Sequence, residues 1–282
     1  MPMSLPWGEP CEARRSGGPD KVRATGSGMQ RRSFLTLSAA LLSRPVFAQG
    51  AVPREVIDDL VTGNRILAKQ GVLDGMGHIS ARHPSRRDHF LLARSVAPAL
   101  VTADDILEYD LSAEPVDARG RTSYRERFIH SEIYRARPDV TSVVHCHTPS
   151  LLPFADSDVP LRAMYHMAAF VAFGVPVFDI RKEAGMTDLL VGDTRLGRAL
   201  ARTLDDKYAV LMRHHGAVVV ANSIPNAVAR AVYLAQDARI QVQTATLGGR
   251  ATYVDPAEAK LRIADPNEYS RAWDLWKREL ER

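Results

Sequence analysis

The chain has 282 residues, of which 45% are hydrophobic and 25% are charged, a composition typical of a globular protein with one sizeable core. Its formal net charge of +4 arises in residues 1–48, which carry seven Lys/Arg and three Asp/Glu; subtracting these from the totals of 37 and 33 leaves thirty of each sign. The formally neutral remainder argues against nucleic acid as a partner.

The N-terminal region has the pattern of a targeting segment. Arg31 and Arg32 precede a short apolar run and a small-residue ending at Ala48, so residues 29–48 are predicted to be a twin-arginine signal peptide. Met29 stands just ahead of the arginine pair, at the usual distance for a start codon. We therefore expect export to the periplasm, with a basic tail on a cytoplasmic protein as the alternative.

The segments on either side of this signal follow from it. Residues 1–28 are rich in Pro, Gly and Arg without periodicity, and we expect them to be a mis-assigned upstream extension. Residues 49–282 are expected to form one catalytic domain. No stretch of this domain approaches the roughly 20 apolar residues that span a bilayer, so the mature form is expected to have no membrane segment.

Hydrophobic periodicity predicts helices and strands that alternate along the domain. In chain order they are a helix over 54–72, short strands over 78–84 and 89–98, a capped turn and strand over 102–110, a helix over 125–137, a strand over 139–147, a helix over 193–204, two strands within 207–223, a long helix over 224–247 and a terminal helix over 268–280. Mixed elements of this kind indicate a single α/β domain with a central sheet covered by helices.

Two histidines near the end of the strand over 139–147 suggest a metal site. Side chains two apart in a strand point the same way, so His145 and His147 share one face and Cys146 faces the other. A third imidazole is available from His214 or His215, which lie between two apolar strands. Three imidazoles with an open position describe a catalytic Zn²⁺ or Fe²⁺ site, whereas ordinary polar histidines at a strand end are the simpler alternative.

A carboxylate lies close to these histidines in the sequence. Glu126 and His130 are four apart on one helical face, and their helix leads into the strand that carries His145 and His147. Glu126 is a candidate general acid/base or fourth metal ligand. The alternative is a solvated Glu-Arg pair on a surface helix.

Three motifs in this order resemble the class II aldolase/adducin family: "GHISAR" at 77–82, "ERFIHSEIYRARPDVTSVVHCH" at 126–147 and "RHHG" at 213–216. The resemblance implies a mainly antiparallel central sheet and a homo-oligomer, specifically a homotetramer. It also implies His145, His147 and His215 as metal ligands and Glu126 as the catalytic acid/base. The implied cofactor is a divalent metal, first Zn²⁺, with Fe²⁺ and Mn²⁺ as alternatives.

The chain departs from the family's sugar-phosphate aldolases where those enzymes hold phosphate with small polar residues. His78, Arg94, Ser95, Tyr124 and Arg125 stand at these positions. Arginine binds carboxylates in bidentate fashion and stacks on aromatic rings. The five residues are therefore predicted to bind a small-molecule substrate that is a planar aromatic acid.

A branch of hydroxy-aromatic acid decarboxylases, such as those acting on dihydroxyphthalate or dihydroxycumate, is most similar in four segments: "GHISAR" at 77–82, "ARSVAP" at 93–98, "ERFIHSEIYRARPDV" at 126–140 and "TDLLV" at 187–191. We accordingly expect a metal-dependent carbon-carbon lyase that decarboxylates a hydroxylated aromatic acid without oxidation, as in aromatic compound catabolism. Three alternatives stay open. They are an aldolase or epimerase acting on a sugar or hydroxy-keto acid, a non-haem Fe(II) oxygenase, and a non-catalytic adducin-like protein.

Overall fold

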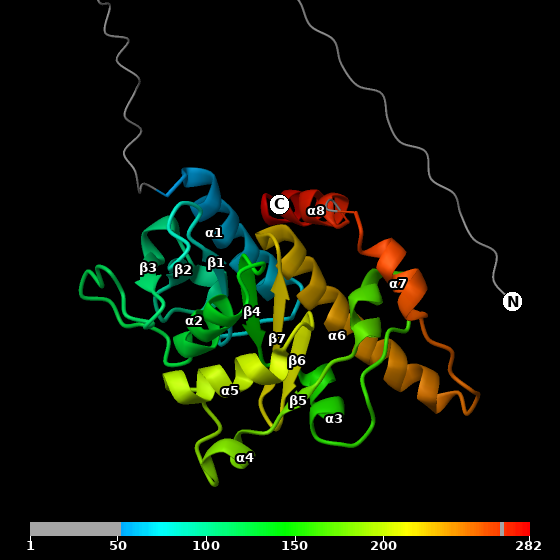
Figure 1. Cartoon of the computed structure of the whole chain (residues 1–282). Coiled ribbons are helices and arrows are strands. Elements are labelled where there is room, and N and C mark those ends of the chain that lie inside the picture. The colour runs from blue at the N-terminus through cyan, green and yellow to red at the C-terminus, as the bar shows by residue number, and fades with distance from the viewer. Residues whose placement is uncertain (1–51, 266–267) are drawn as a thin grey trace, which may run out of the picture. The chain divides into compact units, whose positions relative to one another are not determined.

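The computed structural model describes residues 52–265 and 268–282 (Figure 1). The proposed upstream extension and signal peptide lie outside the described residues, so the predicted export stays a prediction, as does the homotetramer. Among the helices in the described part of the chain, none combines the length and apolarity needed to cross a bilayer.

Seven strands form one sheet in the order β3-β2-β1-β4-β7-β6-β5. All neighbouring strands are antiparallel except β5 and β6, which are parallel. The strands are β1 His78–Arg82, β2 His89–Ala93, β3 Ile106–Asp110, β4 Ser142–Cys146, β5 Val177–Phe178, β6 Ala209–Met212 and β7 Gly216–Ala221. The predicted α/β domain with a mainly antiparallel sheet is confirmed.

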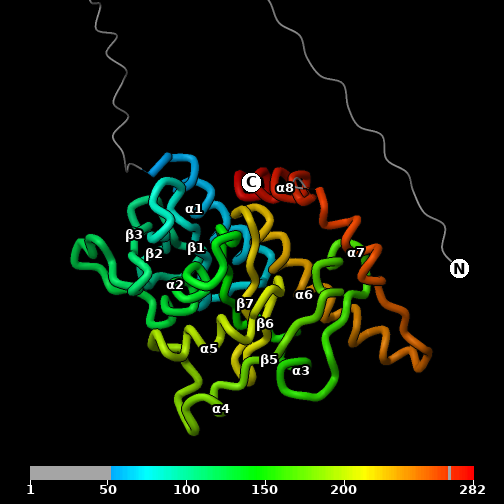
Figure 2. Tube along the Cα trace, in the orientation of Figure 1, coloured from blue at the N-terminus to red at the C-terminus, as the bar shows by residue number. Residues whose placement is uncertain are grey.

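Helices cover both faces of this sheet (Figure 1). The helices are α1 Arg54–Lys69, α2 Arg127–Ala136, α3 Leu152–Ala155, α4 Ile180–Ala184, α5 Thr194–Leu204, α6 Ile224–Thr246, α7 Pro256–Arg262 and α8 Ser270–Leu280. Two apolar clusters fill the layers: α1, α6 and α8 pack on one face, whereas α2 and α5 pack on the other. The trace in Figure 2 runs from α6 through α7 to α8, which lies against α1.

Capping residues explain why two of these helices start where they do. Asp193 caps α5 by accepting a hydrogen bond from the Leu196 N–H, and Ser223 caps α6 by accepting one from the Asn226 N–H. The sequence prediction omitted α3, α4, α7 and β5. These elements have two to seven residues, too few to establish a periodicity.

Alternation along β4 places its side chains in different layers. Val143 and His145 face α2 and α5, whereas Val144 and Cys146 belong to the apolar cluster beneath α1 and α6. The predicted opposition of His145 and Cys146 is therefore confirmed. Cys146 is buried and unavailable to the site on the opposite face.

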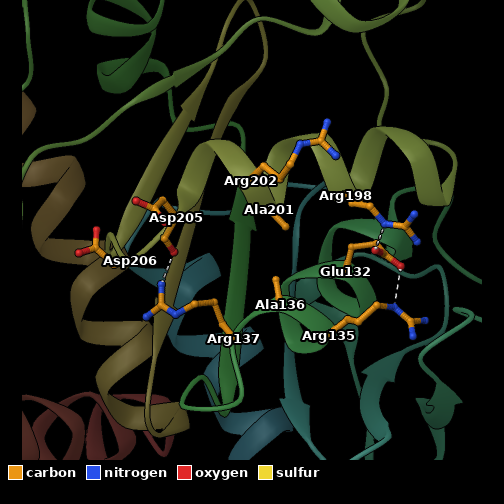
Figure 3. Close-up of a pocket in the computed structure, with 9 residues that line it drawn as sticks. All are labelled: Glu132, Arg135, Ala136, Arg137, Arg198, Ala201, Arg202, Asp205 and Asp206. Atoms are coloured by element: carbon orange, nitrogen blue, oxygen red, sulfur yellow. Dashed lines mark hydrogen bonds and ion pairs between the residues drawn. The ribbon is translucent and has the colours of Figure 1, made fainter.

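A cleft lies where α2 and α5 pack together (Figure 3). Buried Glu132 pairs there with Arg135 at 3.1 Å and Arg198 at 3.2 Å. The guanidinium groups of Arg137, Arg198 and Arg202 point in different directions, so they form no common anion pocket. The cleft is a structural ion-pair network between two helices.

The same two helices approach closely at Gly197. A Cβ added there would lie 2.5 Å from the Phe128 carbonyl oxygen. Alanine normally stabilises a helix by about 1 kcal/mol relative to glycine. At Gly197 the close contact should instead make the substitution destabilising. We expect Gly197→Ala to lower the free energy of unfolding by about 1–3 kcal/mol, measured by urea denaturation.

Gly249→Ala is the matched control for this substitution, because a Cβ at Gly249 would meet nothing within 4 Å. Its stability should stay within about 0.5 kcal/mol of the parent. A Gly197→Ala protein as stable as the parent would contradict the packing described.

Candidate metal centre

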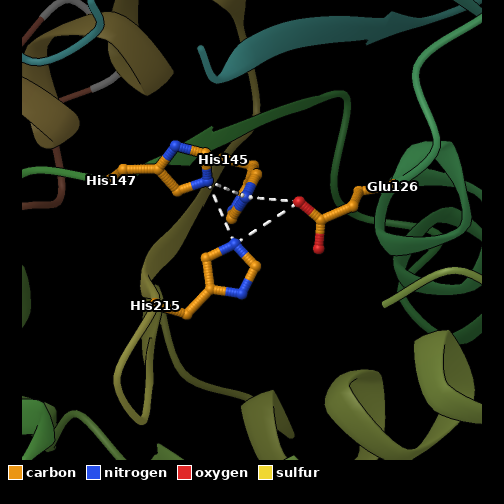
Figure 4. A group of neighbouring side chains, drawn as sticks. All are labelled: Glu126, His145, His147 and His215. Carbon is orange, nitrogen blue, oxygen red and sulfur yellow. Dashed lines mark hydrogen bonds and ion pairs between the residues drawn. The ribbon is translucent and has the colours of Figure 1, made fainter. Parts of the chain in front are cut away.

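Three imidazoles and one carboxylate converge at the end of the sheet, with their candidate ligand atoms within 4.8 Å of one another (Figure 4). Nε2 of His147 lies 3.0 Å from Nε2 of His145 and 3.0 Å from Nε2 of His215. Oε2 of Glu126 lies 3.3 Å from Nε2 of His145 and 3.4 Å from Nε2 of His215. The structure thus brings together the four residues that the sequence predicts.

The strand pairing explains how distant segments meet here. His145 is buried one residue before the end of β4, and His147 follows two residues later on the same face. His215 lies in the turn between β6 and β7, and β7 pairs with β4 so that Ala217 lies opposite Cys146. This register carries the turn to the end of β4.

The turn also distinguishes His215 from its neighbour. His214 has a φ of 55°, and its Nδ1 lies 2.9 Å from Oδ1 of Asp156, away from the other imidazoles. Gly216 has no positive φ; instead, a Cβ there would lie 2.0 Å from the Cys146 carbonyl oxygen. The glycine is required by the close approach of β4 and β7 rather than by the turn itself.

Backbone groups orient two of the imidazoles. Nδ1 of His145 lies 3.1 Å from the Ala217 carbonyl oxygen, and Nδ1 of His215 lies 2.9 Å from the Leu189 carbonyl oxygen. A carbonyl accepts only from a protonated nitrogen, so Nδ1 of each ring carries a proton, and in the neutral ring Nε2 has the lone pair that would bind a metal ion. Such outer contacts commonly fix the tautomer of metal-binding histidines.

Glu126 is buried, with 7% of its surface exposed, and immediately precedes α2. Its Oε1 accepts a hydrogen bond from the Val191 N–H at 2.9 Å, which leaves Oε2 facing the histidines. Burial acts to raise the pKa of Glu126, but the positive charge that His145 and His215 carry when they are protonated and bind no metal outweighs it and holds the pKa well below its usual range. The alternative of a solvated surface pair is therefore wrong.

The donor set fits a divalent cation. Tetrahedral ligands about 2.1 Å from a metal ion lie roughly 3.4 Å from one another, close to the separations of 3.0–3.4 Å found here. Burial and the neighbouring His145 also lower the pKa of His147 to about 4, so its imidazole is neutral near pH 7. Nitrogen and carboxylate donors of this kind suit Zn²⁺ or Fe²⁺.

A cavity of about 740 Å³ opens onto this cluster. Its volume lies within the roughly 300–1,000 Å³ typical of small-molecule sites. Its polar lining includes Glu126, His147 and His215, together with Asp188 and four of the residues predicted to bind substrate: His78, Ser95, Tyr124 and Arg125.

The four predicted residues differ in their surroundings. His78 is buried and lies against Tyr124, with ring centroids 4.4 Å apart. The Tyr124 hydroxyl donates to the Val96 carbonyl oxygen. Arg125 is more exposed and pairs with Asp188 at 2.7 Å.

Arg94 is the one predicted substrate residue that the structure does not bring to the cavity. Its Nε lies 2.6 Å from Oδ1 of Asp105, which is itself held by the backbone and side chain of Thr102. The guanidinium is thus engaged in the turn before β3. A role for Arg94 in substrate binding stays a prediction.

The segment Asp188–Val191 is a part of the site for which the sequence predicted no role, although it belongs to a segment that carries the family resemblance. Leu189 supplies the carbonyl for His215, and Val191 supplies the N–H for Glu126. Both contacts use backbone atoms and carry no residue signature. The φ of Leu189 is 67°, a strained conformation for such a side chain and one associated with functional sites.

Comparison with known proteins identifies the family of the chain. Residues 58–242 match the family described as Class II Aldolase and Adducin N-terminal domain. The chain belongs to this family.

Two decarboxylases are among its relatives. The chain is 37% identical over 245 residues to decarboxylase tropJ of Talaromyces stipitatus, covering 78% of this chain and 92% of that protein. It is 28% identical over 235 residues to the 3,4-dihydroxyphthalate decarboxylase of Arthrobacter keyseri, covering 77% and 90%. Together with family membership, these relatives support a lyase.

The fold also matches solved structures of the family. An aldolase II superfamily protein from Pseudomonas syringae superposes with a TM-score of 0.68 at 24% identity, covering 84% of this chain and 95% of that one. This likeness bears on the fold alone. The predicted family resemblance and fold class are thus confirmed.

The two adjacent histidines of the turn allow a direct test of the ligand set. His215→Ala should lower metal affinity by more than the roughly 10- to 100-fold that losing an outer contact costs. His214→Asn should retain the metal, because asparagine tolerates the positive φ at this position. The measurement is metal content per chain by mass spectrometry after dialysis, and equal losses in both variants would contradict the assignment.

Proposed function

We propose that the protein is a metal-dependent decarboxylase of a hydroxylated aromatic carboxylic acid. The observation that carries the proposal is the cavity that joins the histidine-glutamate cluster to His78, Tyr124 and Arg125. Two rings and a guanidinium suit a planar acid better than a phosphosugar. The similarity to two decarboxylases supports the same reaction class.

The chemistry divides between the metal ligands and Glu126. A divalent cation held by His145, His147 and His215 would supply positive charge that stabilises negative charge developing on the substrate. Tyr124 and His78 form the wall against which the ring packs, and Arg125 holds a carboxylate at the more open side. Ser95 offers a further hydroxyl contact.

Glu126 is placed to move the proton. Its Oε2 takes the phenolic proton of the substrate and returns it to the ring carbon that bears the carboxylate. The bond to the carboxylate then breaks, CO₂ leaves, and the electron pair of that bond restores the aromatic ring. The Val191 N–H holds Oε1 and so fixes which oxygen faces the substrate.

The alternatives use much of the same apparatus. Aldol cleavage also needs a stabilised oxyanion and a proton carrier, so the ligands alone do not separate it from decarboxylation. An Fe²⁺ oxygenase would differ in its strict need for O₂. A non-catalytic role is disfavoured because four potential ligands converge in a cavity.

The test is anaerobic CO₂ release by the metal-loaded protein from a panel of hydroxybenzoates and hydroxyphthalates. Glu126→Gln should lower the rate by about 10²- to 10⁴-fold, because the amide cannot carry the proton. Glu132→Gln is the control, since Glu132 is a buried carboxylate on α2 outside the cavity. Metal content measured on both variants separates loss of the proton carrier from loss of a ligand.

Other outcomes would assign the alternatives. Cleavage of a hydroxy-keto acid or phosphosugar, with no CO₂ from aromatic acids, would replace decarboxylation by aldol chemistry. Turnover that appears only when air is admitted would identify an oxygenase.

We also propose that the protein is exported through its twin-arginine segment. The support is the arginine pair followed by an apolar run that ends at Ala48. Replacing Arg31 and Arg32 together by lysine should keep the protein in the cytoplasm with its signal uncleaved, checked by fractionation and intact mass. Equal periplasmic recovery of parent and variant would contradict export by this route.

A further inference from the structure

A buried chain of hydrogen bonds runs from the cavity into the layer beneath α2. Nδ1 of His78 lies 2.6 Å from Nε2 of His130, and Nδ1 of His130 lies 2.6 Å from Oγ of Ser80. Oγ of Ser80 lies 2.7 Å from the hydroxyl of Tyr134. Of these residues only His78 lines the cavity, whereas His130, Ser80 and Tyr134 are almost completely buried.

The proposed reaction uses His78 only as part of the wall, so the extended chain behind it needs another explanation. A hydrogen bond between two imidazole nitrogens requires one protonated and one bare nitrogen. His130 is completely buried and His78 almost so, and the hydrogen bonds of this chain join them to each other and to a serine rather than to a carboxylate, so both rings are neutral. With both rings neutral, the chain can run in only two directions.

In one direction every proton has an acceptor. The Tyr134 hydroxyl donates to Ser80, the Ser80 hydroxyl donates to Nδ1 of His130, and Nε2–H of His130 donates to Nδ1 of His78. The one remaining proton of the His78 ring is then on Nε2. Because Nδ1 is occupied, Nε2 is the ring nitrogen available to the cavity.

The reverse direction is unfavourable at its buried end. His78 would donate to His130, His130 to Ser80, and Ser80 to Tyr134, so the phenolic proton would need a further acceptor. Among the described residues no acceptor other than Ser80 is found for it.

We infer that Tyr134, Ser80 and His130 are positioning residues that hold His78 as a neutral imidazole with its proton on Nε2. His78 is thereby a fixed hydrogen-bond donor to an oxygen of the bound substrate and not a general base. An uncharged donor can bind a carboxylate or phenolate oxygen without adding a cation beside the metal ligands. The contact to substrate rests on the proposed function, whereas the tautomer does not.

The tautomer can be measured without any substrate. In zinc-loaded protein labelled with ¹⁵N-histidine, the His78 resonances, assigned by their loss in His78→Gln, should show a bare Nδ1 and a protonated Nε2. Tyr134→Phe removes the first donor of the chain and should convert His78 to a mixture of tautomers. Ser80→Ala breaks the chain one link nearer and should do the same.

Tyr109→Phe is the matched control. Tyr109 is also buried against Phe90 and also bonds a serine, Ser123 at 2.9 Å, but it lies outside the chain. Its loss should leave the His78 resonances unchanged. A proton on Nδ1 of His78 in the parent, or identical spectra in Tyr134→Phe and Tyr109→Phe, would overturn the inference.

Kinetics give a second readout for the aromatic acid that is turned over. Tyr134→Phe should raise KM about three- to tenfold with kcat changed less than about twofold, because the donor binds the same oxygen before and during reaction. Tyr109→Phe should change neither constant. If no aromatic acid reacts, the proposed function fails, and the spectra still decide the tautomer.

Discussion

The site depends on how closely two neighbouring segments approach the end of β4. On one side a Cβ at Gly216 would lie 2.0 Å from the Cys146 carbonyl oxygen, and on the other a Cβ at Gly77 would lie 2.8 Å from that of His145. Gly77 also has a φ of 84°, which favours glycine. These two glycines let His215 and His78 reach the same end of the sheet as His145. Without that approach the imidazoles would lie along one end of the sheet but would not converge on one point.

Backbone atoms then orient the side chains that this close approach brings together. Ala217 and Leu189 supply carbonyl acceptors for two imidazoles, and Val191 supplies an N–H for Glu126. Because these groups belong to a strand and to a short tightly turned segment, they reorganise little when charge changes in the site. A preorganised environment of this kind is the main source of electrostatic stabilisation in enzymes. These buried backbone contacts orient the side chains of the site without adding charge to it.

The sequence predicted the long elements and the ligand set for physical reasons that are clear. Helices such as 224–247 repeat their apolar pattern many times, and the period of two in β4 determines that His145 and His147 share a face. Choosing His215 over His214 needed the family resemblance, since both histidines precede the same strand. The ion pair between Arg94 and Asp105 could not be predicted from the sequence, because a contact across a turn produces no periodic pattern. The role of the Asp188–Val191 segment could not be predicted either, because its contacts to the site use backbone atoms.

Charge balance in the cavity bears on how it would accept the anionic substrate that we propose. Arg125 already pairs with Asp188, and Arg94 pairs with Asp105, so neither brings uncompensated positive charge. Glu126 adds a negative charge beside the three imidazoles. For the proposed substrate, attraction for a carboxylate or phenolate would therefore come chiefly from a cation at the histidine cluster, with Arg125 and neutral donors in the wall orienting the anion. In the proposed reaction, an anion drawn to that cation would lie next to Glu126, whose carboxylate lines the same cavity and could exchange a proton with it.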